Sequence, residues 1–215
     1  MKLVSKSLAD QVYDMVKEEI LSGSIPCGSK ISEDSLASQF GVSRTPIREA
    51  LKRLSSYGIV KMEPRSHSSV ISLSRKESDD IAEFRISLED FAIDHINREK
   101  FESSLDALCR YASECQYELG IGNRAKAFEL DSLFHNTLIA TCDNSALSDV
   151  YERLDAKIQL LRIVQNSPDD ELLGYLMQHA RLIELLKAGK KEEAKALMYE
   201  HITHSQKKEG RQCQE

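Results

Sequence analysis

The sequence predicts a mainly α protein with two parts: a short N-terminal module that contains a small hairpin, and an antiparallel bundle of six helices. Two observations predict this division. Three of the four prolines precede residue 65, whereas residues 75–215 show long stretches of helical periodicity. Residues 1–74 carry ten Lys/Arg and eight Asp/Glu, whereas residues 75–215 carry nineteen Lys/Arg and twenty-seven Asp/Glu. We therefore expect two domains, 1–74 and 75–215, with a linker near Ser74.

Composition narrows the class of protein. The 215 residues are 41% hydrophobic with a net charge of -6, which suits folded domains rather than disorder. No apolar stretch approaches the roughly 20 residues of a membrane span, and no signal-peptide core is visible near Met1. The five cysteines form no CxxC pair, unlike a disulfide framework or a thiolate zinc site. We expect a cytoplasmic protein with no membrane partner.

The first module is predicted to contain short elements. Apolar residues at helical spacing predict a first helix from Leu8, with Gly23 as its stop signal. Helices over 33–40 and 43–56 flank Gly41, which supplies the turn between them. Strands are expected at 59–62 and 70–73, joined by a polar loop over 63–69. The six helices of the second part are expected at 76–98, 101–119, 123–142, 145–166, 169–188 and 190–207.

A helix, a short turn, a second helix and a hairpin are typical of a winged helix-turn-helix that binds DNA. The second helix opens with Ser43, Arg44, Thr45 and, one turn on, Arg48. Arg44 and Arg48 are four residues apart, share a face and suit bidentate bonds to guanine, while Ser43 and Thr45 suit phosphate oxygens. The alternative is that both arginines are solvated surface charges.

The string Gly41-Val42-Ser43-Arg44-Thr45-Pro46-Ile47-Arg48-Glu49-Ala50-Leu51 closely resembles the GntR family of bacterial regulators, and the resemblance spans residues 8–73. It implies a homodimer that reads a pseudo-palindromic operator in double-stranded DNA. In that family a basic residue and a glycine stand at the tip of the wing. Here the tip is Pro64-Arg65-Ser66-His67, so Arg65 and His67 are the candidate wing contacts, with His67 in the glycine position.

The second part resembles the helical effector-binding (FCD) domain of the FadR branch of that family. Four positions carry this resemblance and imply a site for a divalent metal: Asp131, His135, His179 and His201. One carboxylate with three imidazoles suits zinc first, with nickel or manganese as alternatives. His95 and His204 lack motif support and are expected to be packed or surface residues, although His204 is an alternative to His201 on the same helix.

Arg85 matches a family arginine that faces the effector pocket, and a planar guanidinium suits a ligand carboxylate. The alternative is a structural salt bridge with Glu89, four residues on. The predicted function is a transcription regulator, a repressor or dual regulator of a catabolic operon, whose operator affinity responds to a small organic acid bound near the metal. It is not expected to be an enzyme. Two rival interpretations remain open: a regulator for which the metal itself is the effector, and a metal-dependent hydrolase.

Overall fold

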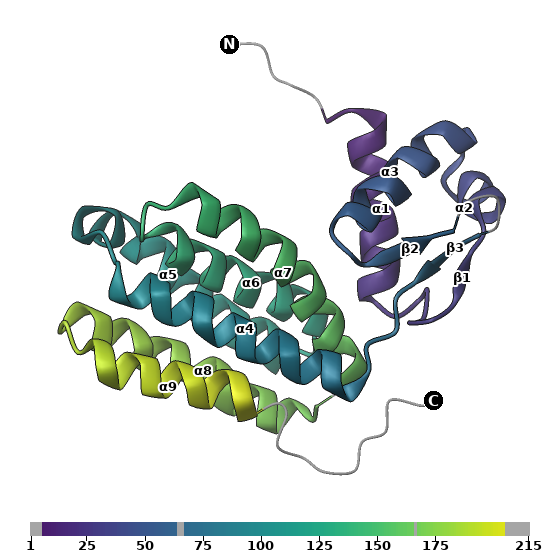
Figure 1. Cartoon of the computed structure of the whole chain (residues 1–215). Helices are drawn as coiled ribbons and strands as arrows, with labels where there is room; N and C mark the ends of the chain where they lie inside the picture. Colours follow the sequence, from purple (N-terminus) through teal and green to yellow (C-terminus); the bar gives the residue numbers. More distant parts are fainter. Residues whose placement is uncertain (1–5, 64–66, 166, 205–215) are drawn as a thin grey trace. The chain divides into compact units, whose positions relative to one another are not determined.

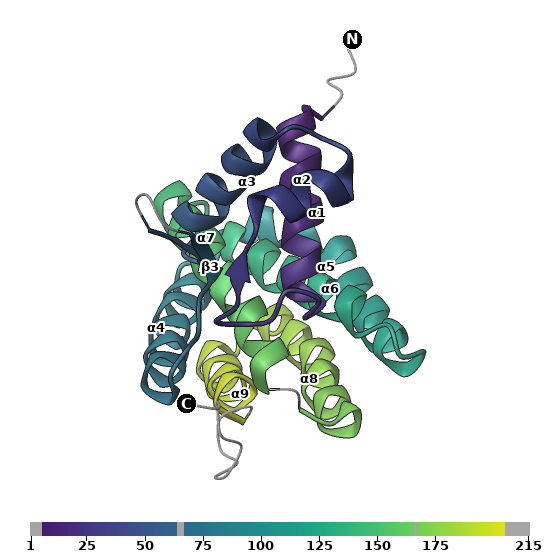
Figure 2. The same cartoon turned by 90° about the vertical axis from the view of Figure 1, so that its right-hand side faces the viewer.

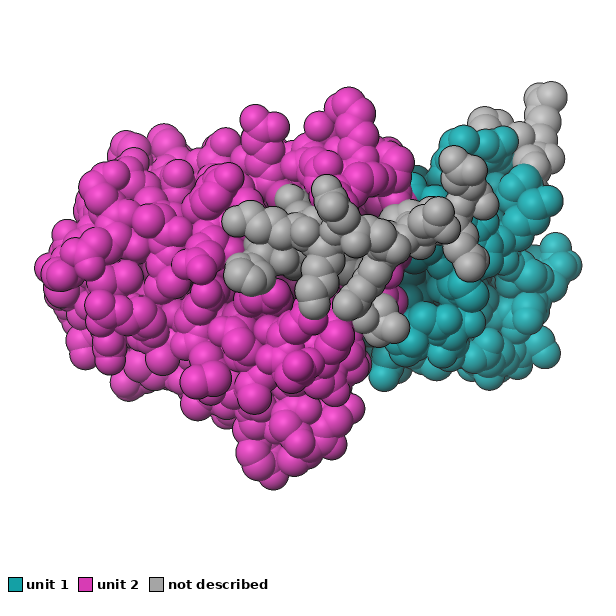
Figure 3. All heavy atoms as spheres, turned by 90° about the horizontal axis from the view of Figure 1, so that it is seen from below, with its two compact units in different colours: residues 1–72 teal, residues 73–215 magenta. Residues whose placement is uncertain are grey.

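The computed structural model describes residues 6–63, 67–165 and 167–204. The chain divides into two compact units at Ser72/Leu73 (Figure 3). The first unit contains three helices and three short strands (Figure 1), namely α1 (Leu8–Leu21), β1 (Lys30–Ile31), α2 (Glu33–Phe40), α3 (Arg44–Ser56), β2 (Val60–Met62) and β3 (Ser68–Val70).

The helix-turn-helix expected from the sequence is confirmed by α2 and α3. Ser32 caps α2 by accepting a hydrogen bond from the backbone N–H of Ser35 at 3.2 Å. Gly41 ends that helix with a φ of 66°, a left-handed conformation that a residue with a Cβ adopts reluctantly. The apolar face of α3, with Ile47 and Leu51 fully buried, then packs against α1.

The hairpin differs from the expectation in its second strand, because β3 covers 68–70 rather than 70–73. Val60 pairs with Val70 and Met62 with Ser68, so the strands are antiparallel and the loop between them is shorter than expected. β1, which the sequence did not predict, pairs with the other edge of β3, giving the order β1-β3-β2. Two residues are too few to show the alternation by which a strand is recognised.

The second unit is a bundle of six helices, as expected: α4 (Arg75–Asp94), α5 (Arg98–Gly120), α6 (Arg124–Ala140), α7 (Ser145–Gln165), α8 (Asp169–Lys187) and α9 (Lys191–His204). Helix α5 packs on α6 and α8, α7 packs on α4 and α6, and α9 lies beside α4 and α8 (Figures 1 and 2). Phe101, Leu108 and Phe134 are fully buried at the centre of the bundle. No helix in the described ranges is long and apolar enough to cross a membrane.

The helix ends differ from the expectation by a few residues, most clearly at α4. It ends at Asp94 rather than at residue 98, because Asn97 already caps α5 by accepting a hydrogen bond from Lys100 N–H at 3.1 Å. No glycine or proline marks this break. The last helix is described as far as His204, so the expected residues 205–207 lie outside the described part of the chain.

Candidate functional site

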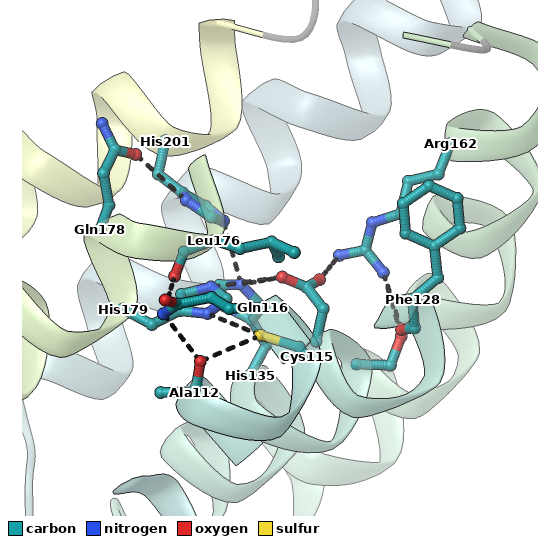
Figure 4. Close-up of polar contacts among 12 residues, drawn as sticks. Ala112, Cys115, Gln116, Phe128, His135, Arg162, Leu176, Gln178, His179 and His201 are labelled. Atoms are coloured by element: carbon teal, nitrogen blue, oxygen red, sulfur yellow. Dashed lines mark hydrogen bonds and ion pairs between the residues drawn. The ribbon is translucent and has the colours of Figure 1, made fainter. Parts of the chain in front are cut away.

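Four side chains of types that can bind a metal meet in the core of the bundle. Helix α6 supplies Asp131 and His135, which are four residues apart and therefore on one face, while α8 supplies His179 and α9 supplies His201. One ligand atom from each side chain can be chosen so that all four lie within 4.8 Å of one another. Figure 4 shows the three histidines converging from their separate helices. The structure thus brings together the four residues expected to hold a metal.

The outer nitrogens of two histidines are engaged by hydrogen-bond acceptors. Nδ1 of His135 lies 2.9 Å from a carboxylate oxygen of Glu89, and Nδ1 of His201 lies 3.2 Å from the amide oxygen of Gln178. Both contacts require a proton on Nδ1, which leaves the lone pair of each Nε2 facing the centre of the cluster. The two Nε2 atoms are 3.2 Å apart.

The third histidine also directs a nitrogen inward. Nε2 of His179 is buried and lies 3.2 Å from Oδ1 of Asp131, but it makes no hydrogen bond with any residue that the structure describes. The same Oδ1 is 3.7 Å from Nε2 of His135. The contact of His179 with Asp131 is thus a close approach of two potential ligand atoms rather than a well-formed hydrogen bond, which is the arrangement expected around a shared cation.

Electrostatics keep these groups in their metal-binding forms. Burial alone would raise the pKa of Asp131, but the Arg162 guanidinium and the nearby histidines hold it well below its usual range. Burial lowers the pKa of His135, and burial together with the neighbouring imidazoles lowers the pKa of His201 well below its usual range. Near neutral pH the cluster therefore offers the Asp131 carboxylate and the neutral imidazoles of His135 and His201.

The spacing of the donors fits a metal ion. Two ligand nitrogens of tetrahedral zinc are expected to lie about 3.3 Å apart, close to the 3.2 Å between the His135 and His201 nitrogens. Cys115 lies beside the cluster, with its Sγ 3.9 Å from Nδ1 of His179. Burial raises the pKa of this thiol to about 12, so it stays protonated and donates to the carbonyl of Ala112. It contacts the outer nitrogen of His179 rather than the centre of the cluster, so it is not one of the four candidate ligands.

A cavity of about 70 Å³ opens beside the four residues, and Asp131 and His201 form part of its wall. Two arginines also line it: Arg85 from α4 and Arg162 from α7. Most of the remaining wall is apolar, with side chains such as Phe128. The cavity therefore places two cations and two of the candidate metal ligands against an apolar surface, an arrangement that suits a small anion with a carbon skeleton.

Of the two roles that the sequence left open for Arg85, the structure shows the salt bridge with Glu89, and contact with an effector stays a prediction. Its Nε donates to Glu89 at 2.6 Å, so the structural salt bridge is present. Its Nη2, in contrast, is buried and has no hydrogen-bond partner among the residues described. Arg85, a residue of the cavity wall, thus holds Glu89 with Nε, while its Nη2 makes no hydrogen bond to a described residue.

The other arginine was not expected at the site. Arg162 donates to Oδ2 of Asp131 and, at 3.1 Å, to the hydroxyl of Ser132. It thereby orients the carboxylate so that the other oxygen, Oδ1, faces the histidines. Arg162 and Glu89 were missed as site residues because their contacts join helices far apart in sequence. The spacing of Glu89 from Arg85 did indicate their mutual pair, but nothing in the sequence indicated His135 as the second partner of Glu89.

The N-terminal end of α3 is exposed, as a DNA-reading helix requires. Ser43 precedes the helix as its N-cap residue, yet its side chain makes no capping hydrogen bond. Arg44, Thr45 and Arg48 are exposed beside it. Each arginine forms an exposed ion pair with an acidic residue of α2, Arg44 with Asp34 and Arg48 with Glu33, so both interpretations of the sequence stay open.

The wing is only partly described. Arg65 lies outside the described residues, so its expected contact stays a prediction. His67 is half-buried, and its carbonyl accepts a hydrogen bond from Glu63 N–H at 3.1 Å, which closes the hairpin. Within the described ranges, Asp143 is the single non-glycine residue with positive φ. His67 therefore avoids the left-handed backbone that its glycine-like position had suggested.

Comparison with known proteins gives the family. The model for bacterial regulatory proteins of the gntR family matches residues 8–70, and the model for the FCD domain matches residues 80–204. An uncharacterised HTH-type transcriptional regulator of Bacillus subtilis (strain 168), YdhC, is 32% identical over 195 residues, 90% of this chain and 87% of that protein. The chain belongs to the GntR family.

A curated repressor and a solved structure are also similar to this GntR-family protein. The gluconate operon transcriptional repressor of Bacillus subtilis (strain 168) is 31% identical over 139 residues, which cover 65% of this chain and 57% of the repressor. The solved structure of McbR/YncC from E. coli has a TM-score of 0.75 at 23% identity, covers 93% of this chain and 95% of that one, and shares its fold. The protein is a DNA-binding transcription regulator with a helical FCD domain.

The remaining histidines are accounted for in part. His95 is exposed at the end of α4, where its ring stacks on Phe91 and its Nδ1 contacts the carbonyl of that residue at 2.8 Å. It was expected to be a surface or packed residue, and this GntR-family structure places it on the surface. The side chain of His204, the alternative to His201, lies outside the described part.

Proposed function

We propose that this regulator changes its operator affinity when a small organic acid binds in the FCD cavity beside a divalent metal. The observation that carries the proposal is the cavity wall, which contains two candidate metal ligands, Asp131 and His201, together with the guanidinium groups of Arg85 and Arg162. A carboxylate is the small-molecule group that both a metal and an arginine recognise.

In this proposal Asp131, His135, His179 and His201 hold the metal, with zinc as the first choice and nickel or manganese as alternatives. With these four ligands zinc would expand from four to five ligands to accept a further group, whereas nickel and manganese accept six. The bound metal would supply a Lewis-acidic position that accepts one carboxylate oxygen of the ligand. The protein supplies the orientation: Glu89, Gln178 and Arg162 fix the side chains around that position.

The charge balance favours an acid with a single carboxylate. Five charged side chains lie within or beside the site, two arginines and three carboxylates: Arg85, Arg162, Glu89, Asp131 and Asp155. Their sum is one negative charge, which a divalent metal converts to one positive charge. One bound carboxylate would neutralise the site, whereas a dicarboxylate would leave a buried excess of negative charge. The similar Bacillus subtilis repressor is named for a gluconate operon, and gluconate is such an acid.

For DNA recognition we propose that Arg44 and Arg48 contact base edges in the major groove and that Ser43 and Thr45 contact phosphates. Arg65 and His67 would contact DNA from the wing.

One recognition helix reads too few base pairs for useful specificity, so we propose a homodimer on a pseudo-palindromic operator. Two exposed phenylalanines, Phe84 and Phe91, lie seven residues apart on α4 and offer an apolar face for the second subunit.

The proposal is tested with an operator selected from a randomised pool of DNA duplexes. Operator affinity is measured by fluorescence anisotropy with zinc-loaded protein, in the presence of a panel of mono- and dicarboxylic acids. We expect a monocarboxylate to change the affinity by about 5–150-fold, the usual range of allosteric coupling. If no acid changes the affinity while removal of the metal by a chelator does, the metal itself is the effector.

The hydrolase interpretation has less support. The carboxylate closest to His135 belongs to Glu89, which accepts hydrogen bonds from Arg85 and Tyr151 and contacts His135 as well. A carboxylate engaged in this way has little capacity to act as a general base for a bound water. We assign no catalytic residue.

A further inference from the structure

We propose that Glu89 is a positioning residue that fixes the tautomer of His135, holding its proton on Nδ1 so that Nε2 faces the metal position. This inference rests on the metal site proposed above. It concerns a residue of α4, the helix that follows the linker from the DNA-binding unit, and it assigns to that helix a direct role in assembling the site.

The geometry begins with one oxygen of the Glu89 carboxylate. Glu89 is fully buried in α4, and its Oε2 lies 2.9 Å from Nδ1 of His135 on α6. An ionised carboxylate only accepts hydrogen bonds, so the imidazole must donate from Nδ1. In a neutral imidazole the proton on Nδ1 leaves Nε2 with its lone pair.

The second oxygen of the same carboxylate is held by two donors. Oε1 accepts from Nε of Arg85 at 2.6 Å and from the hydroxyl of Tyr151, on α7, also at 2.6 Å. Both donors are themselves buried. With Oε1 anchored from α4 and α7, the carboxylate has a fixed rotation, and Oε2 is directed at His135.

This arrangement predicts an unusual response to a nearly isosteric change. In Glu89→Gln the side chain keeps one oxygen and gains an NH₂ group. Arg85 and Tyr151 both point donors at the former Oε1 position, so the amide oxygen is favoured there and the NH₂ group is directed at His135. His135 then has to accept at Nδ1 and carry its proton on Nε2, the nitrogen that should bind the metal.

Tyr151→Phe is the matched control. It removes one of the hydrogen bonds to the same carboxylate, at a position that is equally buried, but it leaves the contact between Glu89 and His135 in place. Lost packing or a weakened network should affect both variants. A change of tautomer should affect only the glutamine variant.

The experiment records ¹⁵N chemical shifts of the histidine rings in metal-free protein and measures zinc affinity by competition with a chelating dye. We expect His135 of the wild type and of Tyr151→Phe to carry its proton on Nδ1, and that of Glu89→Gln to carry it on Nε2. Zinc affinity should fall about 10–100-fold in Glu89→Gln and less than threefold in Tyr151→Phe, because partners that orient metal ligands typically have effects of this size.

Several outcomes would overturn the proposal. A wild-type His135 protonated on Nε2 would do so without any variant, even if Glu89→Gln failed to fold. Equal losses of zinc affinity in the two variants would attribute the effect to packing. Wild-type protein that shows the expected tautomer but binds no zinc would instead refute the proposed metal site and leave the contact of Glu89 with His135 as an orienting one.

Discussion

Nε of Arg48 donates a hydrogen bond to a carboxylate oxygen of Glu33 at 2.6 Å, which joins the recognition helix α3 to the first turn of α2. Arg44 forms the equivalent ion pair with Asp34. All four side chains are at least partly exposed, so the pairs cost little to break. The two arginines proposed to read bases are therefore paired with neighbouring carboxylates, and DNA has to break these ion pairs before the arginines can contact bases.

Removing that negative charge should strengthen DNA binding. In Glu33→Gln, Arg48 loses the carboxylate that competes with DNA for its guanidinium group. The DNA phosphates are also repelled by one negative charge fewer on the protein. We expect a roughly 1.5–5-fold gain in affinity for operator and for random DNA, corresponding to the 0.2–1 kcal/mol of an exposed ion pair. Asp106→Asn, an exposed carboxylate of the helical unit, makes the same change in net charge. An equal gain in that control would attribute the effect to net charge alone.

Removal of either arginine should have the opposite effect and be selective for the operator. Arg44→Ala or Arg48→Ala should each cost about 1–3 kcal/mol of specific binding if the side chain is bidentate to guanine. Binding to random DNA should fall far less. The measurement is anisotropy on both duplexes, with circular dichroism to verify the fold. Operator affinity that stays at the wild-type level in both variants would contradict the assignment of α3 as the reading helix.

The proposed effector contact of Arg85 has to be tested with a substitution that keeps the positive charge, because Arg85 also neutralises the buried carboxylate of Glu89. Arg85→Ala would leave that carboxylate buried without its cation, and we expect a loss of about 3–5 kcal/mol in unfolding free energy by urea denaturation. Arg85→Lys keeps the charge but lacks Nη2, the nitrogen without a partner among the described residues.

The lysine variant should therefore stay folded and bind zinc, yet bind an acid effector at least tenfold more weakly by calorimetry, since the Nη2 donor is lost. An effector affinity equal to that of the wild type would restrict Arg85 to its structural role.

The metal-free protein should lose stability on mild acidification. Burial lowers the pKa values of His135 and His201 from the usual 6.5, so below pH 6.5 the unfolded chain binds protons that the folded one does not. Stability should fall from about pH 6.5 downward, by up to about 1.4 kcal/mol per pH unit for each histidine. The lowered pKa values of Asp131 and Glu89 act in the same direction, but only below about pH 4.5.

Chemical denaturation between pH 7.5 and 5.0 measures this slope. His201→Gln should reduce it, whereas His95→Gln, at an exposed position, should leave it unchanged. A stability that does not vary over this range would show that the buried histidines titrate normally.

The sequence predicted those parts of the molecule that depend on local pattern. The helix-turn-helix follows from Ser32, Gly41 and the apolar stripe of α3, all within about 25 residues. The break between α4 and α5 was placed late because it depends on the cap at Asn97, without a glycine or proline to mark it.

At the site, the four candidate ligands were predicted through family resemblance, and local spacing alone paired only Asp131 with His135. The residues that orient them could not be read from the sequence. The contact of Glu89 with His135 joins residues 46 apart, and that of Arg162 with Asp131 joins residues 31 apart. Such contacts depend on how helices pack, which periodicity does not specify. The ion pairs of α3 with α2 were missed for the same reason.

The central claim, a metal held by Asp131, His135, His179 and His201, is tested most directly by the metal content of untagged protein purified without added metal. Inductively coupled plasma mass spectrometry should find about one divalent ion per chain in the wild type and in the His95→Ala control. The double variant His135→Ala/His179→Ala should have lost it. A double variant that retains its full metal content, or a folded wild type that contains none even after dialysis against zinc, would contradict the account.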